Sequence, residues 1–197
     1  FTGEGNSLFW PLIIMMLSFL GMIVFAYVRE RKNVPVIRKE ESMNSREFWM
    51  FVGALLFFVS AAYIIILTSL PFLNKIFGTQ WAIGQDVEYV YNRVMILVIV
   101  VIGILTAITQ YFKYKETSKK YLWGNLLLPT IITLILSAMI SFFGGFNYDK
   151  YGAGFLAAIH LAMWAGIYAL IANGAYIVKV LKGNMKAAGA SISHLGF

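Results

Sequence analysis

The chain contains no cysteine and little charge. Asp, Glu, Lys and Arg make up 13% of its 197 residues, whereas a soluble domain carries about 25%. Without cysteine there is no disulfide framework, no CxxC redox pair and no thiolate metal site. The sequence also has no Walker loop and no GxGxxG, HExxH or GxSxG motif. These absences exclude the usual signatures of nucleotide-binding proteins, zinc proteases and serine hydrolases.

Acidic residues are missing from every long apolar run, and histidine occurs only twice, at His160 and His194. Ionisable groups inside a membrane usually mark ion and proton paths. A carboxylate-lined path is therefore unsupported, which weakens an interpretation as a transporter. The chain begins at Phe1 without a basic region ahead of its first apolar run, so no signal peptide is predicted. We expect residues upstream of Phe1 to have been removed by processing or truncation.

Hydrophobic residues, by contrast, make up 60% of the chain. Apolar runs of about 20 residues, long enough to cross a bilayer, occupy 8–28, 48–70, 94–111, 122–143 and 155–180. A sixth run begins near Ala187 and is cut off after about half that length. We predict an all-α, polytopic membrane helix bundle with five complete spans and the start of a sixth. Residues 1–197 are expected to form a single transmembrane domain, as a fragment of a longer protein.

Two signals predict how particular spans begin, end and pack. Ser45 or Asn44 can cap the second span, and Pro71 is expected to close it. Pro129 lies inside the fourth run, where a proline frees a backbone carbonyl. We therefore expect a kink or a packing contact at Pro129.

Positive charge is distributed unevenly between alternate connections. The segments 29–47, 113–120 and 179–186 hold six, four and three Lys or Arg residues, and the remaining three are Lys75, Arg93 and Lys150. Cytoplasmic loops of membrane proteins accumulate Lys and Arg. We therefore place these three basic loops in the cytoplasm and the amino end outside. The aromatic connector 71–92 is then extracytoplasmic and lies on the membrane surface. The loops account for the net charge of +7, and no nucleic-acid partner is predicted.

The two histidines are the candidate ligands for a metal or haem. His160 is expected about 10–12 Å below the outer face, and His194 about 10 Å from the cytoplasmic face. A histidine bonded to a neighbouring helix and a haem or metal ligand are both compatible with each position. Small residues around His194 permit close approach by another helix or a flat ligand, and Ser191 could hold its tautomer. The two side chains approach from opposite faces, so a second axial ligand is expected outside this chain.

Four segments share their order and spacing with one membrane protein family. They are FTGEGNSLF at 1–9, SREF at 45–48 opening a helix that ends in LTSLP at 67–71, IGQDVEYVYNRV at 83–94, and GASISHLG at 189–196. Together they resemble the cytochrome c-type biogenesis protein CcmF family, the haem lyase component of a bacterial maturation system. The tryptophan-rich WWD motif of that family is not in this sequence. Over residues 122–186 the chain resembles the family in its hydropathy alone. At 87–89 it has Val-Glu-Tyr where the family resemblance leads us to expect a stretch that contains proline.

The resemblance implies a membrane subunit of the cytochrome c maturation machinery. Such a subunit handles haem for covalent attachment to apocytochrome c on the extracytoplasmic side of the bacterial inner membrane. Only His194 matches the family's membrane-embedded axial ligand of a b-type haem, which leaves His160 as a weaker candidate. Implied partners are the lipid bilayer, a haem chaperone and other maturation subunits, and apocytochrome c. This fragment alone is not expected to be catalytic. The alternative is a non-catalytic polytopic subunit or small-solute transporter, in which both histidines are structural.

Overall fold

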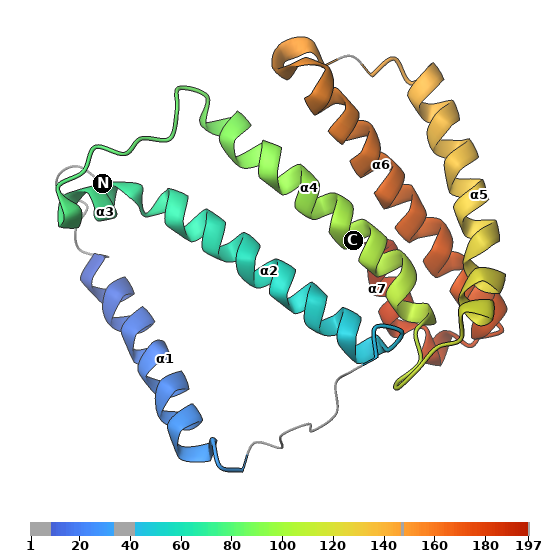
Figure 1. Ribbon diagram of the computed structural model, residues 1–197, viewed down its shortest axis with the longest axis horizontal. Coiled ribbons are helices and arrows are strands. Elements are labelled where there is room, and N and C mark those ends of the chain that lie inside the picture. The colour runs from blue at the N-terminus through green and yellow to red at the C-terminus, as the bar shows by residue number, and fades with distance from the viewer. Residues whose placement is uncertain (1–8, 34–41, 147, 197) are drawn as a thin grey trace. The chain divides into compact units, whose positions relative to one another are not determined.

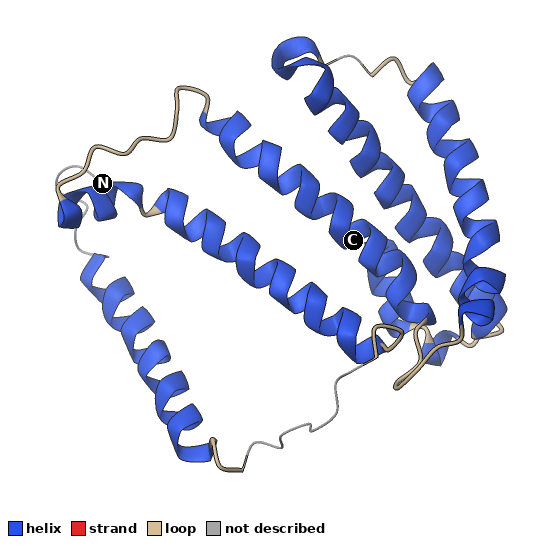
Figure 2. Cartoon of the chain, in the orientation of Figure 1, coloured by secondary structure: helices blue, strands red, loops and turns tan. Residues whose placement is uncertain are grey.

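The computed structural model describes residues 9–33, 42–146 and 148–196 and consists there of helices, turns and loops (Figure 2). The chain divides into two compact units, Phe1–Glu40 and Glu41–Phe197. Residues 1–8 and 34–41 lie outside the described part. Most of the first segment behind the family resemblance and the middle of the predicted 29–47 loop are therefore not assessed. The single domain over 1–197 stays a prediction.

The first unit contains one long helix, α1 (Phe9–Glu30). Its described apolar side chains are exposed around the helix, as expected where lipid or another hydrophobic partner surrounds it. Arg29 and Glu30 form an ion pair at its carboxyl end, with 3.6 Å between Arg29 Nε and Glu30 Oε1. Charged residues thus end the span, as the sequence predicts.

The second unit opens with α2 (Arg46–Thr68). Its N-cap is Ser45, whose hydroxyl accepts a hydrogen bond from the backbone N–H of Phe48 (3.2 Å) and so satisfies one of the free amides of the first turn. Beyond Thr68 the chain turns and continues as α3 (Leu70–Phe77), with Pro71 in the first turn of that short helix. Pro71 therefore begins a new helix directly after the span.

The predicted connector 71–92 is more ordered than a loop. Asn74 on α3 organises the turn that follows: its Nδ2 donates to Trp81 O (2.7 Å), and its Oδ1 accepts from the Thr79 hydroxyl (2.7 Å) and the Trp81 amide (3.0 Å). Phe72, Phe77 and Trp81 remain exposed. Exposed aromatic side chains on a short helix suit the membrane interface.

The third span begins earlier than predicted. The helix α4 covers Val87–Ile108 and continues as the 3-10 turn η2 (Thr109–Tyr111), so it starts seven residues before the expected 94. The Asp86 carboxylate caps it by accepting from the Tyr89 amide (3.0 Å). An acidic residue in the first turn, Glu88, also stabilises this end through the helix dipole. The charged residues that indicate a loop in the sequence therefore cap the helix or lie in its first turns.

The remaining elements follow the predicted order. They are α5 (Lys119–Phe143), the 3-10 turn η3 (Asp149–Tyr151), α6 (Gly152–Ala175) with a π-helical end η4 (Tyr176–Val180), the 3-10 turn η5 (Met185–Ala187) and α7 (Gly189–Gly196). Pro129 is fully buried inside α5, which confirms a packing contact there. In the described residues, five helices are long and apolar enough to cross a membrane, which confirms the predicted five spans. A short helix, α7, lies where the start of a sixth span was predicted, and its membrane crossing stays a prediction.

Within the second unit, α2, α4, α6 and α5 lie in that order (Figure 1). The neighbours α4 and α6 run parallel, although α5 separates them in sequence. The helices on either side, α2 and α5, run antiparallel to them. Small and aromatic side chains make the core, around Ala107, Tyr111, Tyr168 and Ala172.

Polar contacts join the helices at both ends of the second unit. At one end, Arg46 Nε donates to Phe112 O (3.0 Å), close to the basic segment 113–120. At the other end, Asp86 accepts from the Tyr151 hydroxyl (2.9 and 3.0 Å) and pairs with Lys150 Nζ (3.2 Å). The loops therefore alternate between the two ends as the sequence predicts. Which end faces the cytoplasm stays a prediction.

Candidate functional site

His194 lies on α7, a short helix that packs against α6. The amide of Ile192 bonds to Ala188 O (2.8 Å) and fixes the first turn. Ala188 and Ser191 are buried, so one face of α7 is held against the protein. His194 is half-buried. This arrangement presents the imidazole to the neighbouring helices.

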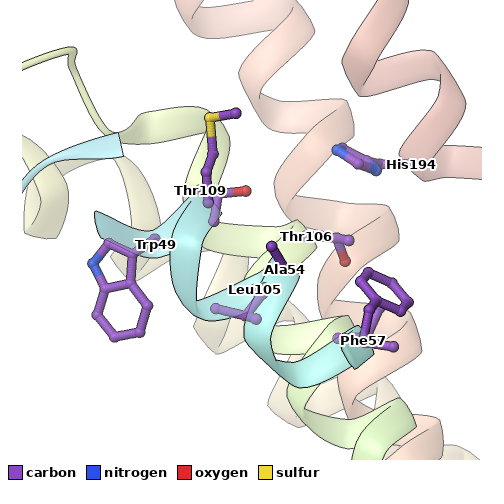
Figure 3. Close-up of a pocket in the computed structure, with 10 residues that line it drawn as sticks. Trp49, Ala54, Phe57, Leu105, Thr106, Thr109 and His194 are labelled. Atoms are coloured by element: carbon purple, nitrogen blue, oxygen red, sulfur yellow. The ribbon is translucent and has the colours of Figure 1, made fainter. Parts of the chain in front are cut away.

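A cavity of about 450 Å³ opens beside His194, and we call it the His194 groove (Figure 3). The α2 helix contributes Trp49, Met50, Gly53, Ala54 and Phe57 to its wall. The rest of the wall comes from α4 (Ile102, Leu105 and Thr106), from Thr109 and from His194. Small-molecule sites typically measure about 300–1,000 Å³ and are mostly apolar. The groove therefore has the size and the lining of a ligand site.

A smaller cavity of about 190 Å³ lies between α4 and α6. It is lined by Ile99, Gly103, Thr106, Gly166, Ala169, Leu170, His194 and Leu195. Thr106 and His194 line both cavities. The imidazole thus lies at the junction of α2, α4 and α6, where one ligand would contact all three helices.

The chemistry of the His194 groove is limited to one strong ligand. The other polar side chains in its wall are the hydroxyls of Thr106 and Thr109 and the indole of Trp49. The Thr106 hydroxyl donates to Gly103 O (2.9 Å), and the Trp49 indole donates to Met43 O (2.9 Å), so both hydrogens are engaged elsewhere. The imidazole of His194 is the nitrogen ligand in this wall with a lone pair suited to a transition metal, beside the softer thioether of Met50.

A bare metal ion would need several protein ligands at once. Among the described residues, no group of three or more His, Cys, Asp or Glu side chains is suitably placed. A metal ion that is bound in a macrocycle, such as a haem iron, needs only axial ligands from the protein, one on each side of the ring. Between Trp49, Met50 and Phe57, the α2 wall has small residues at Gly53 and Ala54, and a Cβ added to Gly53 would meet only Leu105 Cδ1 at 3.9 Å. The described lining therefore offers one imidazole in a mostly apolar wall.

Asn173 supports the wall on the α6 side and was not anticipated from the sequence. It is fully buried, and its Nδ2 donates to Thr106 O and Ala169 O, both at 2.9 Å. The bond to Thr106 O ties α6 to α4, whereas the bond to Ala169 O lies within α6. Thr106 and Ala169 both line the smaller cavity. The available signal was a lone amide within an apolar run, because such groups commonly bond neighbouring membrane helices.

His160 has different surroundings. Its Nδ1 shares a hydrogen bond of 2.9 Å with Ser141 Oγ of α5, and the Phe146 ring stands edge-on to it with centroids 5.9 Å apart. A bond to a neighbouring helix is one of the two alternatives that the sequence leaves open for His160. In the described part of the chain, His160 lines neither cavity that His194 lines. A role for His160 as a metal or haem ligand stays a prediction.

The sequence allows Ser191 to hold the tautomer of the His194 imidazole from one turn away, and this role stays a prediction. In the described structure Ser191 is buried against the protein, whereas His194 is half-buried and lines the groove.

Comparison of the chain with protein-family models, with curated proteins and with solved structures finds no match. The interpretation of the site therefore depends on the residues and their geometry.

Proposed function

We propose that the chain is part of a haem-handling membrane subunit of the cytochrome c maturation machinery, with His194 as an axial ligand of a b-type haem. The proposal joins two independent lines of support. The ordered segments ending in GASISHLG resemble the CcmF family, and the histidine of that last segment lines a ligand-sized apolar groove.

The single observation that carries the proposal is the difference between the two histidines. His160 is engaged by Ser141 (2.9 Å), whereas His194 lines two cavities at the junction of α2, α4 and α6. A partly buried imidazole beside apolar walls is costly unless a partner uses its lone pair. A haem iron provides such a partner.

The protein's own residues would act on the haem in three ways. The imidazole of His194 holds the iron, and the apolar walls exclude water and thereby influence the redox potential. Asn173 anchors Thr106 and Ala169, which keeps the α4 and α6 walls in register. When bound, the haem supplies a one-electron redox centre. The second axial ligand comes from outside this chain.

The proposed working face is the end of the second unit that carries α3. Its exposed Phe72, Phe77 and Trp81 provide an aromatic surface at the membrane interface. We place the haem chaperone, other maturation subunits and apocytochrome c at this end, outside the cytoplasm of a bacterial inner membrane. Covalent attachment itself is assigned to parts of the machinery beyond this chain.

The test is the visible spectrum and haem content of the full-length protein purified from membranes. We expect a b-type Soret band in the wild type and at least a tenfold loss of bound haem in His194→Gly. Imidazole added to His194→Gly should restore the band, because it can replace the missing ligand without repairing a folding defect. Restoration therefore separates ligation from a structural effect.

His160→Ala is the matched control, since it removes the other histidine of the chain. It should retain wild-type haem content. An unchanged Soret band in His194→Gly would overturn the ligand assignment. Absence of haem from the full-length wild type, together with substrate-dependent flux in liposomes, would favour the alternative of a small-solute transporter. The bond between His160 and Ser141 is the observation that favours structural histidines.

A further inference from the structure

The interface between α5 and α6 contains a row of polar side chains, which we call the α5–α6 seam. At its outer end, Ser141 Oγ and His160 Nδ1 are 2.9 Å apart. Deeper, a hydrogen bond of 3.1 Å joins Thr130 Oγ1 and the Tyr168 hydroxyl. The two pairs are separated by eight residues of α6, which corresponds to about 12 Å of helical rise. The seam thus extends well into the hydrocarbon region.

Two buried polar atoms lie between these pairs and have no partner among the described residues. They are Thr133 Oγ1 of α5 and Trp164 Nε1 of α6. Helical spacing places Thr133 between Thr130 and Ser141, and places Trp164 between His160 and Tyr168. Thr133 is fully buried. Both unpartnered atoms therefore occupy the middle of the same seam.

The neighbours of the Trp164 indole and of the Thr133 hydroxyl show how each group is placed in the seam. Trp164 stacks on Tyr168 with ring centroids 5.4 Å apart and planes 19° apart. A threonine in a helix commonly bonds the carbonyl one turn earlier, as Thr130 does with Leu126 O (2.8 Å). Thr133 makes no such bond, so its hydroxyl is available at the interface with α6.

A buried donor or acceptor without a partner destabilises the fold, and the entropy lost by holding one ordered water is usually smaller than that penalty. The indole offers a donor, and the hydroxyl offers both a donor and an acceptor. A ligand here must accept from Trp164, bond to Thr133, and be small and uncharged, because the seam carries no Lys, Arg, Asp or Glu. Water meets each requirement.

We propose that Thr133 and Trp164 form a water-binding site, and that the α5–α6 seam is a hydrated path leading from His160 towards Tyr168. Bound water would join the two existing pairs into one row of hydrogen-bonding groups. Ser141 and His160 are only half-buried, which gives this row access at its outer end. The path lies on the α5 side of α6 and is separate from the proposed haem ligand.

The test is water-edited solid-state NMR of the full-length protein in lipid nanodiscs with 15N-labelled tryptophan. The chain has five tryptophans, and Trp164→Phe assigns the indole signal of interest. We expect magnetisation transfer from water to the Trp164 indole. Thr133→Val keeps the shape of the side chain and removes its hydroxyl, so transfer should fall at least twofold.

Thr133→Ser retains the hydroxyl and should keep the wild-type transfer, which distinguishes the site from a folding defect. Thr68→Val is the matched control in another span, because the Thr68 hydroxyl bonds within its own helix to Ile64 O (2.7 Å). It should leave the Trp164 signal unchanged. Absence of water transfer to Trp164 in the wild type, or transfer that Thr133→Val does not reduce, would overturn the proposal.

Discussion

Gly103 of α4 lies directly against the backbone of Ala165 of α6. A Cβ added to Gly103 would come within 2.9 Å of the carbonyl carbon of Ala165 and 3.0 Å of its oxygen. Ala165 is itself fully buried. Membrane helices lack a hydrophobic force that drives them together and depend on close packing of small residues. This contact is therefore a main source of the association between α4 and α6.

Gly103→Ala is expected to force α4 and α6 apart. Because the obstructing atoms belong to the backbone of Ala165, a side-chain rotation cannot relieve the clash. Overpacking of this kind costs about 1–3 kcal/mol. Thermal unfolding in detergent should show a lower Tm. Gly124→Ala on α5 is the control, since nothing lies within 4 Å of an added Cβ there. Equal Tm values for the two variants would contradict the close approach.

Tyr111→Phe is expected to weaken the opposite end of the same interface. The Tyr111 hydroxyl donates to Ala172 O (2.7 Å), and the side chain is buried. Ala172 O also accepts the backbone amide of Tyr176, so the substitution leaves it partly satisfied. The cost should be about 1 kcal/mol, measured as a lower Tm. Tyr114→Phe serves as the control because Tyr114 is 70% exposed. An unchanged Tm in Tyr111→Phe would show that the bond contributes nothing.

Hydropathy was sufficient to predict the spans, because a bilayer demands apolar runs of a definite length. It was insufficient for the start of α4. Mean hydropathy places Asp86, Glu88 and Arg93 before the span, whereas in the structure Asp86 caps the helix through the Tyr89 amide. The capping function depends on one side-chain bond, which a window of mean hydropathy does not detect.

Which helices pack against each other could not be predicted from the sequence either. When all faces of a helix are apolar, periodicity does not show which helix lies beside it. The sequence therefore does not predict that α4 packs against α6, with α5 between them only in chain order. The sequence leaves a structural bond open as one alternative for His160 and does not indicate Ser141 as the partner. For His194, helical rise gives an expected depth in the membrane, which stays a prediction. The groove depended on α2 and α4, which are far away in sequence.

The contact between Asp86 and Lys150 predicts a pH dependence. Hydrogen bonds from the Tyr89 amide, then from Tyr151 and Lys150, hold the pKa of Asp86 below its ordinary value of 3.8, although desolvation opposes them. A lowered pKa in the folded state means that the stabilisation is present above pH 3.8 and is lost as the pH falls through the folded-state pKa. Asp86→Asn should remove this acid-dependent step. The measurement is Tm between about pH 3 and 7.

Glu88→Gln is the matched control for Asp86→Asn. Glu88 is exposed and approaches Lys150 Nζ only to 4.0 Å. An exposed ion pair of this kind contributes little to stability, so Glu88→Gln should keep the wild-type acid dependence. If Glu88→Gln abolished that dependence while Asp86→Asn retained it, the assignment of the step to the Asp86 cap would be wrong.

Arg46 predicts local rather than global instability at the basic end of the second unit. Its Nε donates to Phe112 O and its backbone amide to Lys113 O, both at 3.0 Å, and the Trp49 and Phe112 rings stack beside these bonds. Arg46→Ala removes this side-chain bond and a longer one from Arg46 Nη2 to Gln110 O (3.4 Å), and it keeps the backbone bond. Since Arg46 is exposed, the expected cost is about 1 kcal/mol, or about a fivefold increase in local opening.

Hydrogen–deuterium exchange of peptides covering 109–118 measures this opening. Arg46→Ala should exchange faster there, with little change in Tm, because the packing of α4 against α6 is untouched. Lys115→Ala is the control within the same loop, since Lys115 is exposed and makes no hydrogen bond or ion pair in the described structure. Because Trp49 and Thr109 also line the His194 groove, faster exchange in Arg46→Ala should be accompanied by weaker haem retention in the full-length protein. Faster exchange with unchanged haem content would show that this end of the groove does not contact the haem.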